Sequence, residues 1–137
     1  MRSVILIALA MMATPASSAP FPEPSDRWLL DVRGAATGGT AEFGRWDATP
    51  ATGSSWNLQV TCGTVDRTGR ERVLFRGRGA AIRDPRGRMV AVWDGPPGSP
   101  EKPGFVWSPG VDDLHPRVAV RGLAPCPGGP GELSTGA

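Results

Sequence analysis

The clearest pattern in the chain is an alternation of apolar and polar side chains over short segments. Trp56, Leu58, Val60 and Cys62 occupy every second position, with polar or small residues between them. Because successive side chains of a strand point to opposite faces, this alternation predicts a strand with one buried face. The same pattern recurs in shorter form at residues 28–33, 71–76 and 117–121, and the short apolar run at residues 89–93 is a further strand candidate.

Turn-forming residues separate these segments. Asp66–Arg70 (DRTGR) contains a glycine between two predicted strands, and Asp84–Gly87 (DPRG) has Pro and Gly at the positions that a type I turn favours. Two consecutive hairpins are therefore expected. Outside the N-terminal segment, no stretch of helical length has helical periodicity. The sequence predicts an all-β fold, either a small antiparallel β-sandwich or a barrel, of about seven or eight short strands.

Alternation also assigns side chains to faces. Trp28 and Trp56 fall on the inward faces of their strands, and so do Val73 and Phe75. Phe43 and Trp46 lie an odd number of residues apart, so a β-bulge at the intervening Gly44 is expected to restore a common face.

The N-terminal segment differs from the rest of the chain. Arg2 precedes the unbroken apolar run Val4–Ala13, and small residues follow, which is the order typical of a cleavable secretory signal. A run of this length is about half of the roughly twenty residues that span a bilayer. We expect a protein without a transmembrane segment that is secreted or periplasmic. The expected organisation is a signal peptide (1–18), an extended Pro-rich arm (19–26), a single β domain (27–126) and a disordered tail (127–137).

The chain contains two cysteines, Cys62 and Cys126. Export places them in an oxidising compartment, where a pair of thiols can close into a disulfide. Their spacing fits neither a metal-binding knuckle nor a redox CxxC pair. We therefore expect one structural disulfide between them.

The charge is nearly balanced over the whole chain, with 15 basic and 13 acidic side chains, but it is unevenly distributed. All but one of the basic residues are arginines, a bias that points to a GC-rich bacterial genome. Between Asp66 and Arg88, eight arginines face three acidic residues, a local balance of +5. Strand alternation and the adjacent turn predict an arginine face made of Arg70, Arg72, Arg76, Arg78, Arg86 and Arg88.

Such a face fits a non-enzymatic binding module that engages an anionic polymer or an acidic protein. Arginines that merely keep a surface solvated are the alternative interpretation. The partner itself is unknown from the sequence.

Residues for catalysis are scarce. His115 is the single histidine and lies near Asp112 and Asp113, too few ligands for a zinc or calcium site. No serine lies in a GxSxG nucleophile elbow. We expect no enzyme, no cofactor and no metal site.

Two alternative functions remain open. The Pro-rich loop Asp94–Gly104 (DGPPGSPEKPG) on a disulfide-linked scaffold suits an inhibitor of an extracellular hydrolase, since a pre-organised loop loses little entropy on binding. A carbohydrate-binding module would instead use an exposed tryptophan, for which Trp107, with Lys102 nearby, is the best candidate.

Overall fold

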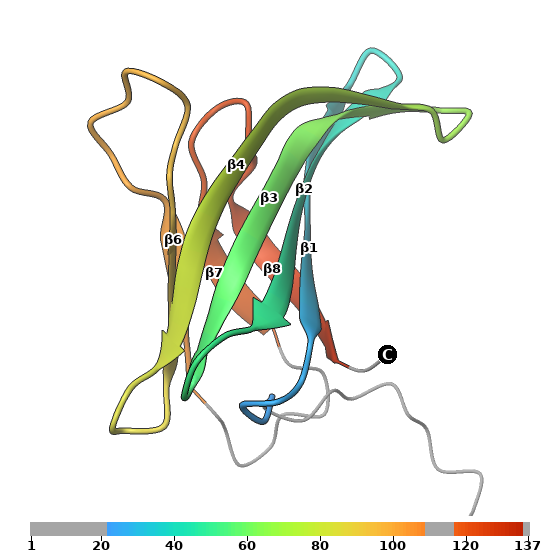
Figure 1. The fold of residues 1–137 in the computed structure, drawn as a ribbon. Coiled ribbons are helices and arrows are strands. Elements are labelled where there is room, and N and C mark those ends of the chain that lie inside the picture. Colours follow the sequence, from blue (N-terminus) through green and yellow to red (C-terminus); the bar gives the residue numbers. More distant parts are fainter. Residues whose placement is uncertain (1–21, 109–116, 136–137) are drawn as a thin grey trace, which may run out of the picture.

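The structure is a computed structural model that describes residues 22–108 and 117–135. Within these residues, eight antiparallel strands follow one another around a closed barrel, and the last pairs with the first (Figure 1). The strands are β1 (Trp28–Thr37), β2 (Thr40–Pro50), β3 (Ser55–Asp66), β4 (Glu71–Arg83), β5 (Met89–Trp93), β6 (Gly104–Trp107), β7 (Arg117–Arg121) and β8 (Gly129–Thr135). The all-β prediction is confirmed, and of its two alternatives the barrel is the one that forms.

The connections β1–β2, β3–β4, β5–β6 and β7–β8 lie at the upper end in Figure 1. The N-terminal segment and the β2–β3 and β4–β5 connections lie at the lower end. The described residues include no helix long and apolar enough to cross a bilayer. The expected signal peptide, residues 1–18, lies outside the described part of the chain.

The C-terminal segment, expected to be disordered from residue 127, contains β8. This strand pairs with β7 on one side and β1 on the other, and so closes the barrel. Its inward positions include Gly131, which lies against the side chain of Leu30, and the buried Leu133. The prediction was wrong because a strand needs apolar residues only at alternate positions, and here a glycine takes one of them.

The residues before β1 pack against the lower end of the barrel. Pro22 is buried, and its carbonyl oxygen accepts a hydrogen bond from Arg83 Nη2 at 2.9 Å. The indole Nε1 of Trp56 donates to the carbonyl oxygen of Asp26 at 2.7 Å. This short segment is therefore attached to the barrel by side chains of β3 and β4.

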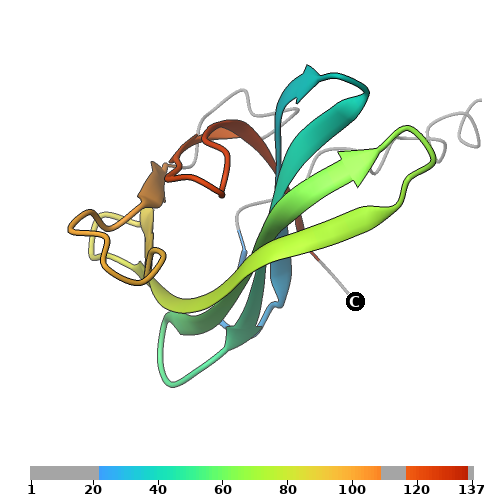
Figure 2. The same cartoon turned by 90° about the horizontal axis from the view of Figure 1, so that it is seen from above.

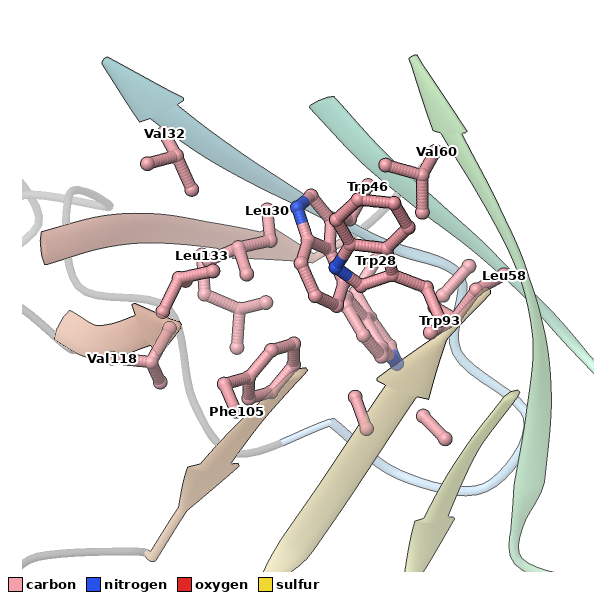
Figure 3. Packing of buried hydrophobic residues seen from close by; sticks show 14 of the residues in the cluster. Trp28, Leu30, Val32, Trp46, Leu58, Val60, Trp93, Phe105, Val118 and Leu133 are labelled. Atoms are coloured by element: carbon pink, nitrogen blue, oxygen red, sulfur yellow. The ribbon is translucent and has the colours of Figure 1, made fainter. Parts of the chain in front are cut away.

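Aromatic side chains fill the barrel interior. Figure 3 shows Trp28, Trp46, Trp93 and Phe105 pointing into it from four strands. Ring contacts with centroid distances of 5.2–6.0 Å connect, in order, Trp56, Trp28, Phe105, Trp46, Trp93 and Phe75. Tilted and edge-to-face pairs of this kind stabilise beyond their burial by about 0.5–1.5 kcal/mol each.

Trp107 also faces inward, contrary to the prediction of an exposed aromatic. It pairs with the buried Met89 across β5 and β6, and only 5% of its surface is exposed. Because β6 alternates like any strand, Trp107 shares the inward face of Phe105. The predictions for Trp28 and Trp56 are confirmed, since both are buried in the core.

The expected bulge at Gly44 does not form. The β2–β3 register runs without a shift along its whole length, so Phe43 and Trp46 point to opposite faces. Phe43 is nevertheless buried outside the interior cluster, with the Arg45 guanidinium 5.1 Å from its ring centroid.

A bulge occurs instead in β4. The register shifts where Cys62 pairs with Phe75 and Gly63 pairs with Val73, which leaves Leu74 as the extra residue. Gly63 allows this because a Cβ there would collide with the carbonyl oxygen of Arg72. Phe75 packs against the core as predicted, but the bulge turns Val73 outward, where it is 39% exposed.

The predicted disulfide between Cys62 and Cys126 is present, with the two Cα atoms 5.1 Å apart. It connects β3 to the segment between β7 and β8. That segment also contacts β2, because Pro127 lies next to Gly44. The disulfide therefore attaches the last β-connection to the opposite wall of the barrel.

Replacing both cysteines, Cys62→Ala/Cys126→Ala, should lower the free energy of unfolding by about 4 kcal/mol, since the unfolded chain loses a long covalent loop. Urea denaturation followed by tryptophan fluorescence measures the difference. Reductant should destabilise the wild type to a similar extent and leave the double variant unchanged. An unfolding midpoint shared by the wild type and the variant would contradict this role of the disulfide.

Candidate functional site

An open groove crosses the outer face of β2, β3 and β4. It consists of two adjoining depressions of about 500 and 380 Å³ that share Asp47 and Gln59. We call it the outer groove; its polar lining side chains are Arg27, Arg45, Asp47, Thr49, Asn57, Gln59, Thr61, Arg76 and Arg78.

The strand register places these side chains in rows. Asn57, Gln59 and Thr61 form a column along the outward face of β3, because the residues between them point into the barrel. On β4, Arg78 pairs with Gln59 and Arg76 pairs with Thr61. Neutral hydrogen-bonding groups thus lie at the centre of the groove, beside a row of cations roughly 7 Å apart along the strand.

The opposite side of the groove carries ion-paired residues. Arg27 lies 3.8 Å from Asp47, and Arg45 Nη2 lies 2.6 Å from Glu71 Oε2. The hydrogen bond from Arg45 lowers the pKa of the Glu71 carboxyl, and the same bond raises the pKa of Arg45. Glu71 therefore stays charged and neutralises Arg45 at neutral pH.

Arg76 and Arg78 are different, because neither has an ion-pair partner among the described residues. Both are exposed. The nearest acidic residue by register is Asp94, whose backbone N–H donates to the Arg78 carbonyl oxygen at 2.7 Å while the two side chains form no ion pair. The groove consequently offers two guanidinium groups to an external anion.

The six arginines expected to share one face are divided among three places. Arg76 and Arg78 lie in the outer groove. Arg70 and Arg72 line a separate depression of about 380 Å³ with Thr40 and Thr64. The physical reason is the bulge in β4, which pairs Arg72 with Thr64 and so reverses its face relative to Arg76.

Arg86 and Arg88 lie at the β4–β5 turn, at the lower end of the barrel (Figure 1). Arg88 is bound there by Asp84, with Arg88 Nη2 and Asp84 Oδ2 2.8 Å apart. Burial opposes ionisation of Asp84, but hydrogen bonds from the N–H groups of Arg88 and Arg86 and from the Arg88 side chain lower its pKa overall. Arg88 therefore stabilises the turn through Asp84. The prediction of a single arginine face is wrong, because the six arginines lie in three different places.

The Pro-rich loop between β5 and β6 is ordered by its own hydrogen bonds. The N–H of Ser99 donates to the carbonyl oxygen of Pro96 at 3.0 Å, and the N–H of Trp93 donates to that of Pro103 at 3.1 Å. Lys102 is exposed on this loop. The binding site predicted for Trp107 and Lys102 lacks its exposed aromatic ring, because Trp107 is buried in the core.

The remaining candidates for chemistry, Asp112, Asp113 and His115, lie outside the described residues. Across residues 22–108 and 117–135, no cluster of three or more His, Cys, Asp or Glu side chains is suited to hold a metal ion.

Comparisons with protein-family models, with curated proteins and with solved structures found no match. The function must therefore be argued from the chain's own residues.

The alternation of apolar and polar residues predicts only part of the outer groove. Alternation already placed Asn57, Gln59 and Thr61 on an outward face, but nothing local indicated which cations would lie beside them. Arg27 precedes β1, and Arg45 belongs to β2, so only the β1–β2–β3 register brings them to this surface. The position of Arg76 and Arg78 beside β3 could have been predicted, because these arginines lie on the second strand of the predicted hairpin.

Substitution of Glu71→Gln should lower the free energy of unfolding near neutral pH by about 0.5 kcal/mol, because this is a typical contribution of a partly exposed ion pair to stability. The folded-state pKa of Glu71 is depressed, so its contribution is present above the unfolded-state pKa and is lost as the pH falls through the folded-state value. Chemical denaturation at several pH values should show the wild type and the variant converging in acid. Glu132→Gln, an exposed glutamate on β8, is the control; a difference between wild type and Glu71→Gln that is independent of pH would contradict the ion pair's role.

Proposed function

We propose that this protein is a non-enzymatic binding module that holds an acidic polysaccharide in the outer groove. One observation carries the proposal. Arg76 and Arg78, which have no ion-pair partner among the described residues, lie beside the hydrogen-bonding column of Asn57, Gln59 and Thr61.

The two kinds of side chain suit the two kinds of group on such a polymer. Guanidinium groups bind carboxylates or sulfates through paired, charge-assisted hydrogen bonds. Amide and hydroxyl side chains donate to and accept from sugar hydroxyls. Because the cations and the neutral groups follow neighbouring strands, the groove suits an extended chain that lies along the strands of the barrel wall.

Binding is favoured over catalysis by the carboxylate content of the groove. Asp47 is the acidic side chain that lines it, and Asp47 is paired with Arg27. The lining residues include neither a histidine nor a second carboxylate to complete an acid–base pair. The alternative of sugar binding by an exposed tryptophan has lost its basis, since all five tryptophans are buried.

The test measures binding to an immobilised sulfated polysaccharide such as heparin and to a soluble polyuronate. The full chain is expressed for export and purified from the exported fraction. Arg76→Gln/Arg78→Gln should weaken binding by at least about tenfold, because two charge-assisted contacts are lost. The dependence of the affinity on salt should also become shallower, since fewer counterions are displaced.

The matched control is Arg86→Gln/Lys102→Gln, which removes the same charge from two exposed side chains away from the groove. Its affinity should stay within roughly a factor of two of the wild type at moderate salt, where screening limits distant charges. Equal losses in the two double variants would reduce the interaction to net charge and refute the groove. A wild type that binds neither polymer would refute the function.

The Pro-rich loop gives a second candidate function, inhibition of an extracellular hydrolase. The observation in its favour is the order of the loop, with hydrogen bonds between Ser99 and both Pro96 and Glu101 and an ion pair of 3.6 Å between Glu101 and Arg121. A loop already fixed in one conformation gives up little entropy when it enters an active-site cleft.

If this second function holds, the exported protein should inhibit at least one member of a panel of proteases and lysozymes at micromolar concentration. Ser99→Ala should then weaken inhibition several-fold, because it removes the side-chain hydrogen bonds to Glu101 and loosens the loop. Ser134→Ala, on β8, is the control. Absence of inhibition across the panel would count against this function and leave the groove unaffected.

A further inference from the structure

The β3–β4 hairpin continues beyond the barrel wall. Figures 1 and 2 show its turn as a projection at the upper end, well away from β5 to β8. The turn is closed by two backbone hydrogen bonds of 3.0 Å, from Asp66 N–H to the Arg70 carbonyl oxygen and from Gly69 N–H to that of Asp66. We call residues 66–74 the hairpin tip.

Two adjacent aliphatic side chains are exposed on the hairpin tip. Val73 is 39% and Leu74 is 49% exposed, and the bulge explains both, because it turns Val73 outward and leaves Leu74 outside the strand pairing. Solvent-exposed aliphatic residues are ordinary when they occur singly. Here two of them lie next to each other on a projecting element that contributes little to the core.

Arginines of the same tip lie at the turn and on the hairpin face opposite Val73, because Arg72 pairs with Thr64 while Val73 pairs with Gly63. Arg67, Arg70 and Arg72 are exposed, and none has an ion-pair partner within the described part of the chain. Glycine at position 39 leaves room for the Arg67 side chain, whose Nε would lie 2.9 Å from a Cβ there. Arg67 therefore packs against the β1–β2 turn, and Arg70 and Arg72 line the depression that includes Thr40 and Thr64.

The two acidic residues of the tip are already engaged. The Asp66 carboxylate accepts hydrogen bonds from the Thr68 hydroxyl and from the N–H groups of Thr68 and Arg70, which lower its pKa and fix the turn. Glu71 is bound by Arg45 from β2. Counting that pair as neutral, the tip carries three cations against one carboxylate.

We propose that the hairpin tip docks on an anionic lipid bilayer, with Val73 and Leu74 entering the interfacial region and Arg67, Arg70 and Arg72 contacting lipid headgroups. Exposed aliphatic residues with adjacent cations are the combination that binds proteins to such surfaces. A soluble acidic chain would satisfy the arginines but would give the aliphatic pair nothing to contact. The site adjoins the outer groove through the Glu71–Arg45 ion pair, but the two share no lining side chain, and it does not depend on the polysaccharide proposal.

The test is co-sedimentation of the exported protein with vesicles of phosphatidylcholine alone and with vesicles that also contain phosphatidylglycerol. The wild type should bind the anionic vesicles and not the zwitterionic ones. Arg67→Gln/Arg70→Gln/Arg72→Gln should reduce the partition coefficient on the order of a hundredfold, since each arginine near an anionic surface contributes about fivefold. Val73→Thr/Leu74→Thr should reduce it by roughly tenfold while retaining the charge.

The matched control is Ile82→Thr/Val106→Thr, which removes two aliphatic side chains from the outer face of β4 and β6, where they are 51% and 54% exposed and so more accessible than Val73 and Leu74. It should bind anionic vesicles like the wild type. All variants share the wild-type N-terminus, so any contribution of that segment cancels in the comparison. Circular dichroism and unfolding midpoints verify that each variant is folded.

The outcomes separate the two proposals. Arg76→Gln/Arg78→Gln should lose polysaccharide binding and keep vesicle binding, and the tip variants should do the reverse. Equal binding to both kinds of vesicle, or none to either, would overturn the bilayer proposal. So would anionic binding that Val73→Thr/Leu74→Thr leaves unchanged, which would indicate that a charged face alone, or a protein partner of that face, accounts for the arginines.

Discussion

The aromatic packing inside the barrel is the interaction on which the rest of the structure depends. A sheet of eight strands closes only if its interior is filled, and here a chain of ring contacts runs from Trp56 to Phe75 through six strands. Each ring contacts rings from other strands rather than a sequence neighbour, so the contacts enforce closure and not merely local order. Since all five tryptophans are buried, none of them is exposed to stack on a ligand, and the binding surfaces proposed above lie on the outer wall and the loops.

Closure also explains why short, weakly apolar segments matter. β8 contributes few apolar side chains, yet without it β1 and β7 would both have unpaired edges. The disulfide adds a covalent attachment close to this closure, because Cys126 lies just before β8 and Cys62 lies across the interior on β3. Backbone pairing and the disulfide together hold a segment whose composition alone resembles that of a disordered tail.

The outside of the barrel is divided by one backbone irregularity. The bulge opposite Gly63 reverses the alternation of β4, so Arg76 and Arg78 face the outer groove while Arg72 faces the other way and Val73 becomes exposed. A cation-rich strand is thereby split into two surfaces with different chemistry. One carries Arg76 and Arg78 beside neutral hydrogen-bonding groups, and the other carries Arg70 and Arg72 beside Thr40 and Thr64.

The sequence by itself determined the all-β class, most of the strands, the two hairpins, the burial of Trp28 and Trp56 and the cysteine pair, because all of these follow from local periodicity, turn chemistry and the count of thiols. The tertiary structure alone decided that the sheet closes, that Trp107 lies inside and which arginines share a surface. Alternation fixes a side chain's face only while the register is regular. A collision between a potential Cβ at Gly63 and a carbonyl oxygen on the next strand is a property of paired backbones, and no single strand's sequence contains it.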